Sequence, residues 1–151
     1  MESFAPSAAS RGTELGQILP ERPRFGVLGD RTRVRQVLVN LLGNAIKFTD
    51  EGHITLELIC DEGADYMVVR ISDTGIGIAA ADLAIIFKRF RQVDGSVTRE
   101  RGGTGLGLAI SYDLVKLMHG ELSVTSELGT GMTFELHIPV LGTYSKGTQI
   151  E

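Results

Sequence analysis

Residues 30–49 read DRTRVRQVLVNLLGNAIKFT and are the most informative stretch of the sequence. Their apolar positions recur at the period of an α-helix: Val34, Val37, Leu38, Leu41, Leu42, Ala45 and Ile46. The spacing predicts one long amphipathic helix that begins at Asp30 or Thr32 and ends before Asp50-Glu51-Gly52.

A polar stripe accompanies the apolar face of this helix. Asn40, Asn44 and Lys47 are spaced four and three residues apart, so they line one side of the helix. Two amides and an ammonium there suit a triphosphate with its metal, and the Asn44 side-chain oxygen is a possible Mg²⁺ ligand. A solvated polar stripe is the alternative, which two asparagines in mid-helix weaken because Asn is a mediocre helix former.

The rest of the chain divides into strands and helices by its periodicity. Alternating residues predict strands over 53–60, 66–73, 121–127 and 132–140, after two short strand-like runs within 13–28. Helices are predicted over 80–91 and 105–119, the second with its inward face made by Leu106, Ile110, Leu114, Leu117 and Met118. This order predicts an α/β domain in which helices cover one face of a mixed sheet.

Domain limits and cell compartment follow from composition. Residues 1–11 are expected to be a disordered linker, 12–141 one domain, and 142–151 a flexible tail. The formal net charge of −4 gives no general attraction to nucleic acid or an anionic membrane, and no apolar run suits a transmembrane helix. The single Cys60 fits a reducing, cytoplasmic location.

Glycine is enriched and clustered. The chain has 19 glycines in 151 residues, well above the usual share of about 7%. Eight of them form three groups: Gly75 and Gly77; Gly102, Gly103, Gly105 and Gly107; Gly129 and Gly131. Such clusters between regular elements indicate backbone that approaches a phosphate ligand. The P-loop, the G-x-G-x-x-G fingerprint, the H-E-x-x-H zinc motif and the G-x-S-x-G elbow are all absent from the sequence.

Asp73 is a candidate site residue on physical grounds alone. Strand alternation puts it on the same face as Met67, Val69 and Ile71, where a carboxylate is costly unless something satisfies it. It opens the run DTGIGI at 73–78, and as an acceptor it can take the exocyclic amine of adenine. An ordinary Asp-Gly turn is the alternative.

A second glycine run, GGTGLGL at 102–108, opens the last predicted helix. Free backbone N–H groups and the helix dipole there can receive a polyphosphate. The preceding segment carries five basic residues, which suggest a lid over the nucleotide and otherwise form a solvated charge run: Lys88, Arg89, Arg91, Arg99 and Arg101.

Together these motifs resemble the catalytic ATP-binding domain of sensor histidine kinases, in the superfamily of gyrase-type, MutL-type and heat-shock chaperone ATPases. The resemblance covers about 25–140 and rests on five segments in the family's order. They are the N box at 30–49, the first glycine box at 73–77, the F box Ile86-Phe87-x-x-Phe90-x-Gln92, the second glycine box at 103–108, and the last glycine box Gly129-Thr130-Gly131-x-Thr133-Phe134. The residues of these motifs are most similar to those of hybrid-type kinases. Lys88-Arg89 departs from the Glu-Pro or Glu-Arg pair common in the family's F box.

The resemblance implies a Bergerat ATP-binding fold, an α+β two-layer sandwich whose mixed, mostly antiparallel sheet is covered on one face by about three helices, with an ATP lid. It implies ATP and Mg²⁺ as cofactors, with Asn44 on the metal, Asn40 and Lys47 on phosphates, Asp73 on adenine and Thr133 supporting adenine through water. The full implied nucleotide-binding set is Asn40, Asn44, Lys47, Phe48, Asp73, Gly75, Ile76, Gly77, Ile78, Arg89, Arg91, Gly103, Thr104, Gly105, Leu106, Gly107, Leu108 and Thr133.

Asn40 also bears on the reaction. Hydrolysing relatives have a Glu four residues before the metal-binding Asn, and Asn40 is no useful base at neutral pH. Tight nucleotide binding with slow hydrolysis is therefore expected, with the γ-phosphoryl passing to a His on a separate dimerisation and phosphoacceptor domain and then to a response regulator receiver domain. His53, His119 and His137 do not fit the acceptor pattern.

Two alternatives stay open at this stage. An anti-sigma-factor-type serine kinase of the same superfamily shares the nucleotide site, and a degenerate regulatory domain keeps the fold without the reaction. The resemblance implies no nucleic-acid partner and no direct membrane contact by this domain, whether or not its parent protein is membrane-anchored.

Overall fold

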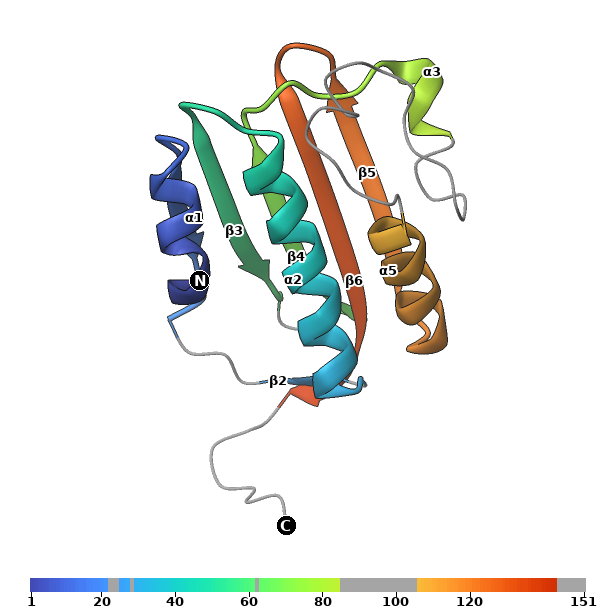
Figure 1. The fold of residues 1–151 in the computed structure, drawn as a ribbon. Helices are drawn as coiled ribbons and strands as arrows, with labels where there is room; N and C mark the ends of the chain where they lie inside the picture. Colours follow the sequence, from blue (N-terminus) through green and yellow to red (C-terminus); the bar gives the residue numbers. More distant parts are fainter. Residues whose placement is uncertain (22–24, 28, 62, 85–105, 144–151) are drawn as a thin grey trace.

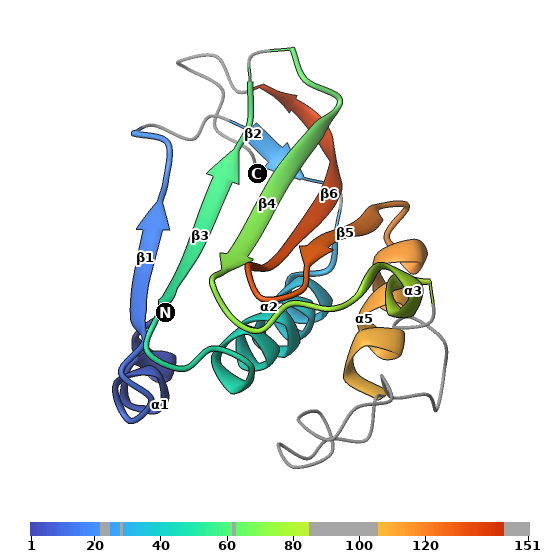
Figure 2. The same ribbon diagram turned by 90° about the horizontal axis from the view of Figure 1, so that it is seen from above.

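The computed structural model describes residues 1–21, 25–27, 29–61, 63–84 and 106–143, and these form two layers (Figure 1). Seen end-on, the helices lie together on one side of the sheet (Figure 2). The predicted two-layer architecture is therefore confirmed.

The sheet has six strands: β1 (Glu14–Ile18), β2 (Phe25–Val27), β3 (His53–Ile59), β4 (Tyr66–Asp73), β5 (Glu121–Glu127) and β6 (Gly131–Thr143). Its order is β1-β3-β4-β6-β2, with β5 also paired to β6. The β1–β3 pair is parallel and all other pairs are antiparallel, so the sheet is mixed and mostly antiparallel as predicted.

The long helix α2 (Arg31–Lys47) forms where residues 30–49 predict it. Its N-cap is Asp30, whose carboxylate accepts from the backbone N–H groups of Thr32 at 2.8 Å and Arg33 at 3.2 Å. The buried face consists of Val37, Leu41, Leu42, Ala45 and Ile46. The periodicity of the sequence thus identified both the start and the inner face of this helix.

Helix α5 (Leu106–Leu117) is present, but its predicted inner face is partly wrong. Ile110 and Leu117 are 38% and 63% exposed, whereas Ala109 and Ser111 are buried beside Val115 and Met118. Small residues let α5 pack closely against α2, and hydrophobic size alone pointed to the larger side chains. Helix α3 (Ala80–Leu83) begins where a helix over 80–91 is predicted, and residues 85–91 lie outside the described part.

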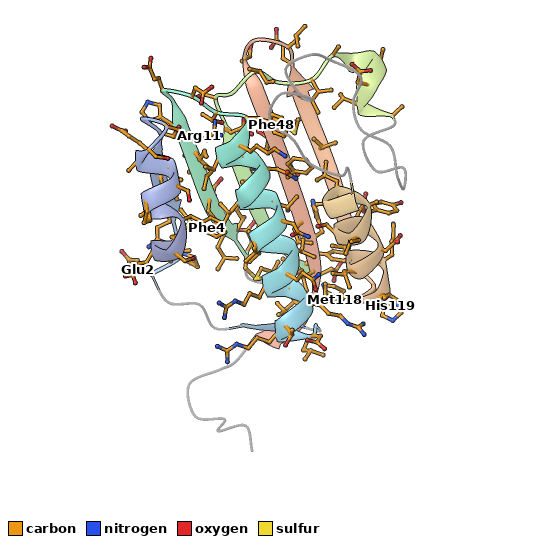
Figure 3. All side chains as sticks on the ribbon, viewed as in Figure 1. Glu2, Phe4, Arg11, Phe48, Met118 and His119 are labelled. Carbon is orange, nitrogen blue, oxygen red and sulfur yellow. The ribbon has the colours of Figure 1, made fainter. Side chains whose placement is uncertain are left out.

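The two chain ends correct the sequence-based expectation. Residues predicted to be a disordered linker form the short helices η1 (Glu2–Phe4) and α1 (Ala5–Ala9). They are ordered because Ala8 is 1% exposed and Met1 and Phe4 pack against the core, as Figure 3 shows for Phe4 between α1 and α2. At the other end, β6 continues through 142–143, where it pairs with β2; residues 144–151 lie outside the described part.

Several elements end together at one edge of the domain. The C-terminal end of α2, the end of β4 and the β5–β6 turn meet at the top of Figure 1, and α5 begins on the same side. No helix in the described ranges is long and apolar enough to span a membrane.

Candidate nucleotide-binding site

The polar stripe of α2 faces the start of α5. Asn40, Asn44 and Lys47 are all half-buried. The Asn40 side-chain amide donates to Gly107 O at 3.4 Å and to Ser111 Oγ at 3.2 Å. Because a carbonyl oxygen only accepts, the NH₂ end of Asn40 must face α5. Two of the predicted site residues, Asn40 and Gly107, are thereby brought together.

Phe48 closes the helix. It is the C-cap of α2, half-buried, with its backbone N–H bonded to Asn44 O at 3.1 Å. The Lys47 ammonium lies 5.5 Å from the centre of the Phe48 ring. Figure 3 places this ring at the end of α2 that meets the loop after β4. An aromatic face and a cation therefore lie side by side next to the polar stripe.

Asp73 occupies the position that strand alternation predicted. It is the last residue of β4 and half-buried on the inner face, beyond Met67, Val69 and Ile71. Its Oδ1 accepts from the backbone N–H of Gly75 at 2.9 Å. Burial raises the pKa of the Asp73 carboxyl above its ordinary value, and hydrogen bonds from the backbone of Gly75 and Met132 counteract that rise.

The loop 74–78 is fixed at three points, which sets the distance between Asp73 and α2. Ile76 N–H donates to Phe48 O at 3.3 Å, and Gly129 N–H donates to Ile76 O at 2.7 Å. Ile78 N–H donates to Ser126 Oγ at 2.7 Å. Ser126, which the sequence analysis did not single out, therefore ties the Asp73 end of the site to β5.

The glycines of this region serve close packing between backbone segments. A Cβ on Gly75 would overlap Phe48 O, one on Gly77 would overlap Glu127 O, and one on Gly131 would overlap Asp73 O. Gly77 and Gly131 also have φ of +66° and +135°, which L-residues rarely adopt. These glycines allow the end of α2, the loop after β4 and the start of β6 to converge.

Thr133 is not brought to Asp73. Its hydroxyl donates to Ser72 Oγ at 3.1 Å, and the register pairs Ser72 with Thr133 and Asp73 with Met132. Neighbouring residues of a strand point to opposite faces, so Thr133 lies on the face of the sheet away from Asp73. The predicted support of adenine by Thr133 is thus not compatible with this register, and Met132 occupies the inner position.

Several predicted nucleotide-binding residues lie outside the described part of the chain: Arg89, Arg91, Gly103, Thr104 and Gly105. The expected F box and ATP lid lie outside it as well. Leu106 begins α5, and Gly107 and Leu108 belong to its first turn. The end of the second glycine box thus lies in the first described turn of α5.

An open hollow of about 410 Å³ lies at the same edge of the domain, lined by Phe48, Asp50, Thr74, Gly75, Ile76, Leu128 and Gly129. It shares Phe48, Gly75 and Ile76 with the predicted site, but neither Asp73 nor Asn44 lines it. In the described residues, no cluster of three or more His, Cys, Asp or Glu side chains is arranged to hold a metal. A metal here would depend on ligand oxygens and neutral side chains such as Asn44.

Residues 29–142 match the family of histidine kinase-, DNA gyrase B- and HSP90-like ATPases. The chain is 47% identical over 116 residues to the autoinducer 2 sensor kinase/phosphatase LuxQ of Vibrio cholerae, covering 76% of this chain and 14% of LuxQ. It is 44% identical over 139 residues to hybrid signal transduction histidine kinase L of Dictyostelium discoideum, covering 89% of this chain and 8% of that protein.

Among solved structures, full-length ShkA in complex with AMPPNP superposes with a TM-score of 0.80 at 35% identity, over 95% of this chain and 29% of ShkA. The chain therefore spans only a small part of the curated relatives it matches. Sequence, fold and site lead to one assignment: the chain belongs to the histidine kinase-, DNA gyrase B- and HSP90-like ATPase family, as the ATP-binding catalytic domain found in sensor histidine kinases.

Proposed function

We propose that this domain binds Mg-ATP between α2, the loop after β4 and the start of α5, and transfers the γ-phosphoryl group to a histidine on a separate dimerisation and phosphoacceptor domain. The observation that carries the proposal is the attachment of Asp73 to the end of α2. Gly75 N–H bonds Asp73 Oδ1, and Ile76 N–H bonds Phe48 O. These two bonds support the proposal, because they connect the proposed adenine acceptor to the end of the helix that carries the proposed phosphate ligands.

In the proposed complex, Asp73 binds the adenine end of the ligand. An ionised carboxylate only accepts hydrogen bonds, so it pairs with the exocyclic amine of adenine. The Phe48 ring offers an apolar face for the base. The loop around Gly75, Ile76, Gly77 and Ile78 supports the base from the strand side.

In the proposed complex, residues of α2 and α5 bind the phosphate end of the ligand. Lys47 contacts phosphate oxygens, and Asn40 holds the start of α5 beside them through its bond to Gly107 O. The first residues of α5, Gly107 and Leu108, add N–H groups and a favourable helix dipole. Asn44 would contribute its side-chain oxygen to Mg²⁺, which supplies charge neutralisation on the phosphates. Arg89, Arg91, Gly103, Thr104 and Gly105 complete the set from the segment outside the described residues.

Asn40 makes the domain a transferase in preference to a hydrolase. With its NH₂ group directed at Gly107 O and Ser111 Oγ, it is no proton acceptor for water. In the proposed reaction an imidazole nitrogen of the acceptor attacks the γ-phosphorus. The bond to the β–γ bridging oxygen breaks, ADP leaves, and the imidazole N–H proton passes to solvent.

The acceptor is placed on another domain because the histidines of this chain have other settings. His53 Nδ1 lies 3.0 Å from Glu14 Oε2. His137 packs edge-on to Tyr66 with ring centres 6.3 Å apart. His119 follows the end of α5 with φ of +58°. A receiver domain of a response regulator is the proposed next recipient of the phosphoryl group.

The test mixes this chain with Mg-[γ-³²P]ATP and a separately produced two-helix phosphoacceptor hairpin. We expect acid-labile, base-stable label on the hairpin, no transfer by Asn44→Ala, and transfer by Gln36→Ala, which alters an exposed residue of the same helix. Acid-stable label would assign a serine kinase instead. A Mg-dependent ATPase rate well above background in the chain alone would contradict the proposed transferase role.

A further inference from the structure

Three oxygen atoms surround the missing side chain of Gly75. A Cβ built on this residue would overlap Phe48 O and would lie 2.9 Å from Thr49 Oγ1 and 3.0 Å from Asp73 Oδ1. Gly75 has only a hydrogen atom at that position. The Thr49 hydroxyl and the Asp73 carboxylate therefore border the same small space.

The hydrogen bonds around this space leave one donor unused. Gly75 N–H donates to Asp73 Oδ1 and Ile76 N–H donates to Phe48 O. Thr49 is 0% exposed, and its Oγ1 has no hydrogen-bond partner among the described residues. A buried hydroxyl without a partner costs about 1–3 kcal/mol, so an orphan of this kind calls for an explanation.

The backbone of Thr49 is held in place on both sides. Its carbonyl accepts from Thr13 Oγ1 at 3.1 Å in a buried bond, and its N–H donates to Ile46 O at 3.4 Å. The backbone position of Thr49 is therefore fixed, and its Oγ1 borders the same space as Asp73 Oδ1 without being hydrogen-bonded to it in the ligand-free structure. In the sequence, Thr49 is recognisable only as a member of the N box.

The hydrogen-bonding capacity of Asp73 suggests what the hydroxyl does. A carboxylate offers about four lone-pair sites. The backbone N–H groups of Gly75 and Met132 occupy two of them. In the proposed complex the adenine amine takes a third, which leaves one site for a further donor.

We propose that Thr49 is a positioning residue for Asp73: in the nucleotide-bound domain its hydroxyl donates to the Asp73 carboxylate and holds the other oxygen toward the adenine amine. This rests on the proposed function, in which Asp73 is the adenine acceptor. The register excludes Thr133 from such a part, because its side chain lies on the other face of the sheet. Thr49 supplies the hydroxyl from the helix side instead.

The first test separates positioning from packing. Thr49→Val keeps the shape and removes the hydroxyl. By calorimetry with the 151-residue chain, we expect about tenfold weaker Mg-ATP binding and recovery in Thr49→Ser. Because the ligand-free hydroxyl is unpaired, the melting temperature of ligand-free Thr49→Val should be unchanged or higher. A parallel fall in melting temperature and affinity would show a purely structural role and overturn the proposal.

The second test uses the ligand to identify the group through which Thr49 acts. Purine riboside 5′-triphosphate lacks the 6-amino group, so it gives Asp73 no donor. Thr49→Val should therefore weaken its binding much less than that of ATP, a ligand-based double-mutant cycle. Equal losses for the two nucleotides would overturn the role through Asp73. Thr125→Val, an exposed threonine of β5, is the matched control and should bind both like the parent chain.

Failure of the proposed function looks different from failure of this inference. If the parent chain does not bind Mg-ATP, the nucleotide site itself is wrong. If the parent chain binds Mg-ATP and discriminates against the purine analogue while Thr49→Val behaves identically, only the role of Thr49 is wrong.

Discussion

Gly131 lies directly against the backbone of Asp73. A Cβ on Gly131 would overlap the Asp73 carbonyl group, and Gly131 has φ of +135°. The first residue of β6 thus carries no side chain because the carboxylate-bearing end of β4 occupies that space. The last glycine box of the sequence is a packing requirement of the Asp73 site.

Gly131→Ala is therefore expected to destabilise the domain by about 3 kcal/mol or more, through the steric overlap with Asp73 and the positive φ together. Gly129→Ala is the control, since Gly129 also has positive φ, at +85°, but no heavy atom beyond its chain neighbours lies within 4 Å of its Cβ position. It should cost only about 1–2 kcal/mol. Urea denaturation of both variants measures the difference, and equal losses would contradict the steric explanation.

Phe4 gives a test of the unexpected N-terminal helices. The side chain packs against the core although residues 1–11 have the composition of a linker. Phe4→Ala should lower the free energy of unfolding by about 2 kcal/mol, less than for a fully buried phenylalanine because Phe4 is half-buried. Glu2→Ala, an exposed change in the same segment, should have little effect. Indistinguishable denaturation curves would mean that this segment does not stabilise the domain.

The elements that the sequence predicted well are those with a strong local signal. The α2 helix has a regular apolar period and an Asp N-cap, and β4 alternates between buried and less buried residues, so their faces and the burial of Asp73 were predictable. The five family motifs likewise made the overall fold predictable. These signals depend on neighbours in sequence, which a single sequence contains.

The features that were missed depend on contacts between distant segments. The inner face of α5 uses Ala109 and Ser111, whose burial follows from the approach of α2 and Asn40. The outward position of Thr133 is an exception, because alternation over 132–140 already implies it and only the role taken from the family resemblance disagreed with it. Residues 1–9 are ordered because their apolar side chains pack on a surface that only the folded core provides.

Asn40 supports a prediction about the contact between α2 and α5. Its NH₂ group donates to Gly107 O and Ser111 Oγ, and Asn40→Asp replaces that donor with an acceptor of the same shape. The new carboxylate would face a carbonyl oxygen, so a loss of about 1–2 kcal/mol in ligand-free stability is expected. Gln36→Glu adds the same charge at an exposed site of α2 and should change stability by less than about 0.5 kcal/mol. Equal effects would indicate that net charge alone is responsible.

The raised pKa of Asp73 predicts opposite pH dependences for stability and for binding. Since burial raises the pKa of this carboxyl in the folded domain, its protonated form adds stability that is lost as pH rises through the folded-state pKa, above the ordinary Asp range. Asp73→Asn does not titrate at this position. The difference between its free energy of unfolding and that of the parent chain should therefore shift in favour of Asp73→Asn as the pH rises from acid to neutral. Asp61→Asn makes the same substitution at an exposed position and controls for the loss of one negative charge.

Mg-ATP binding should behave the other way, because only the charged carboxylate accepts from the adenine amine without donating a proton of its own. The affinity of the parent chain should therefore rise over the same pH interval in which its ligand-free stability falls, and Asp73→Asn should bind weakly throughout. Urea denaturation and calorimetry at matched pH values measure the two curves. If the parent and Asp73→Asn stability curves run parallel, the carboxylate carries no buried charge, and the physical basis for placing adenine against it is lost.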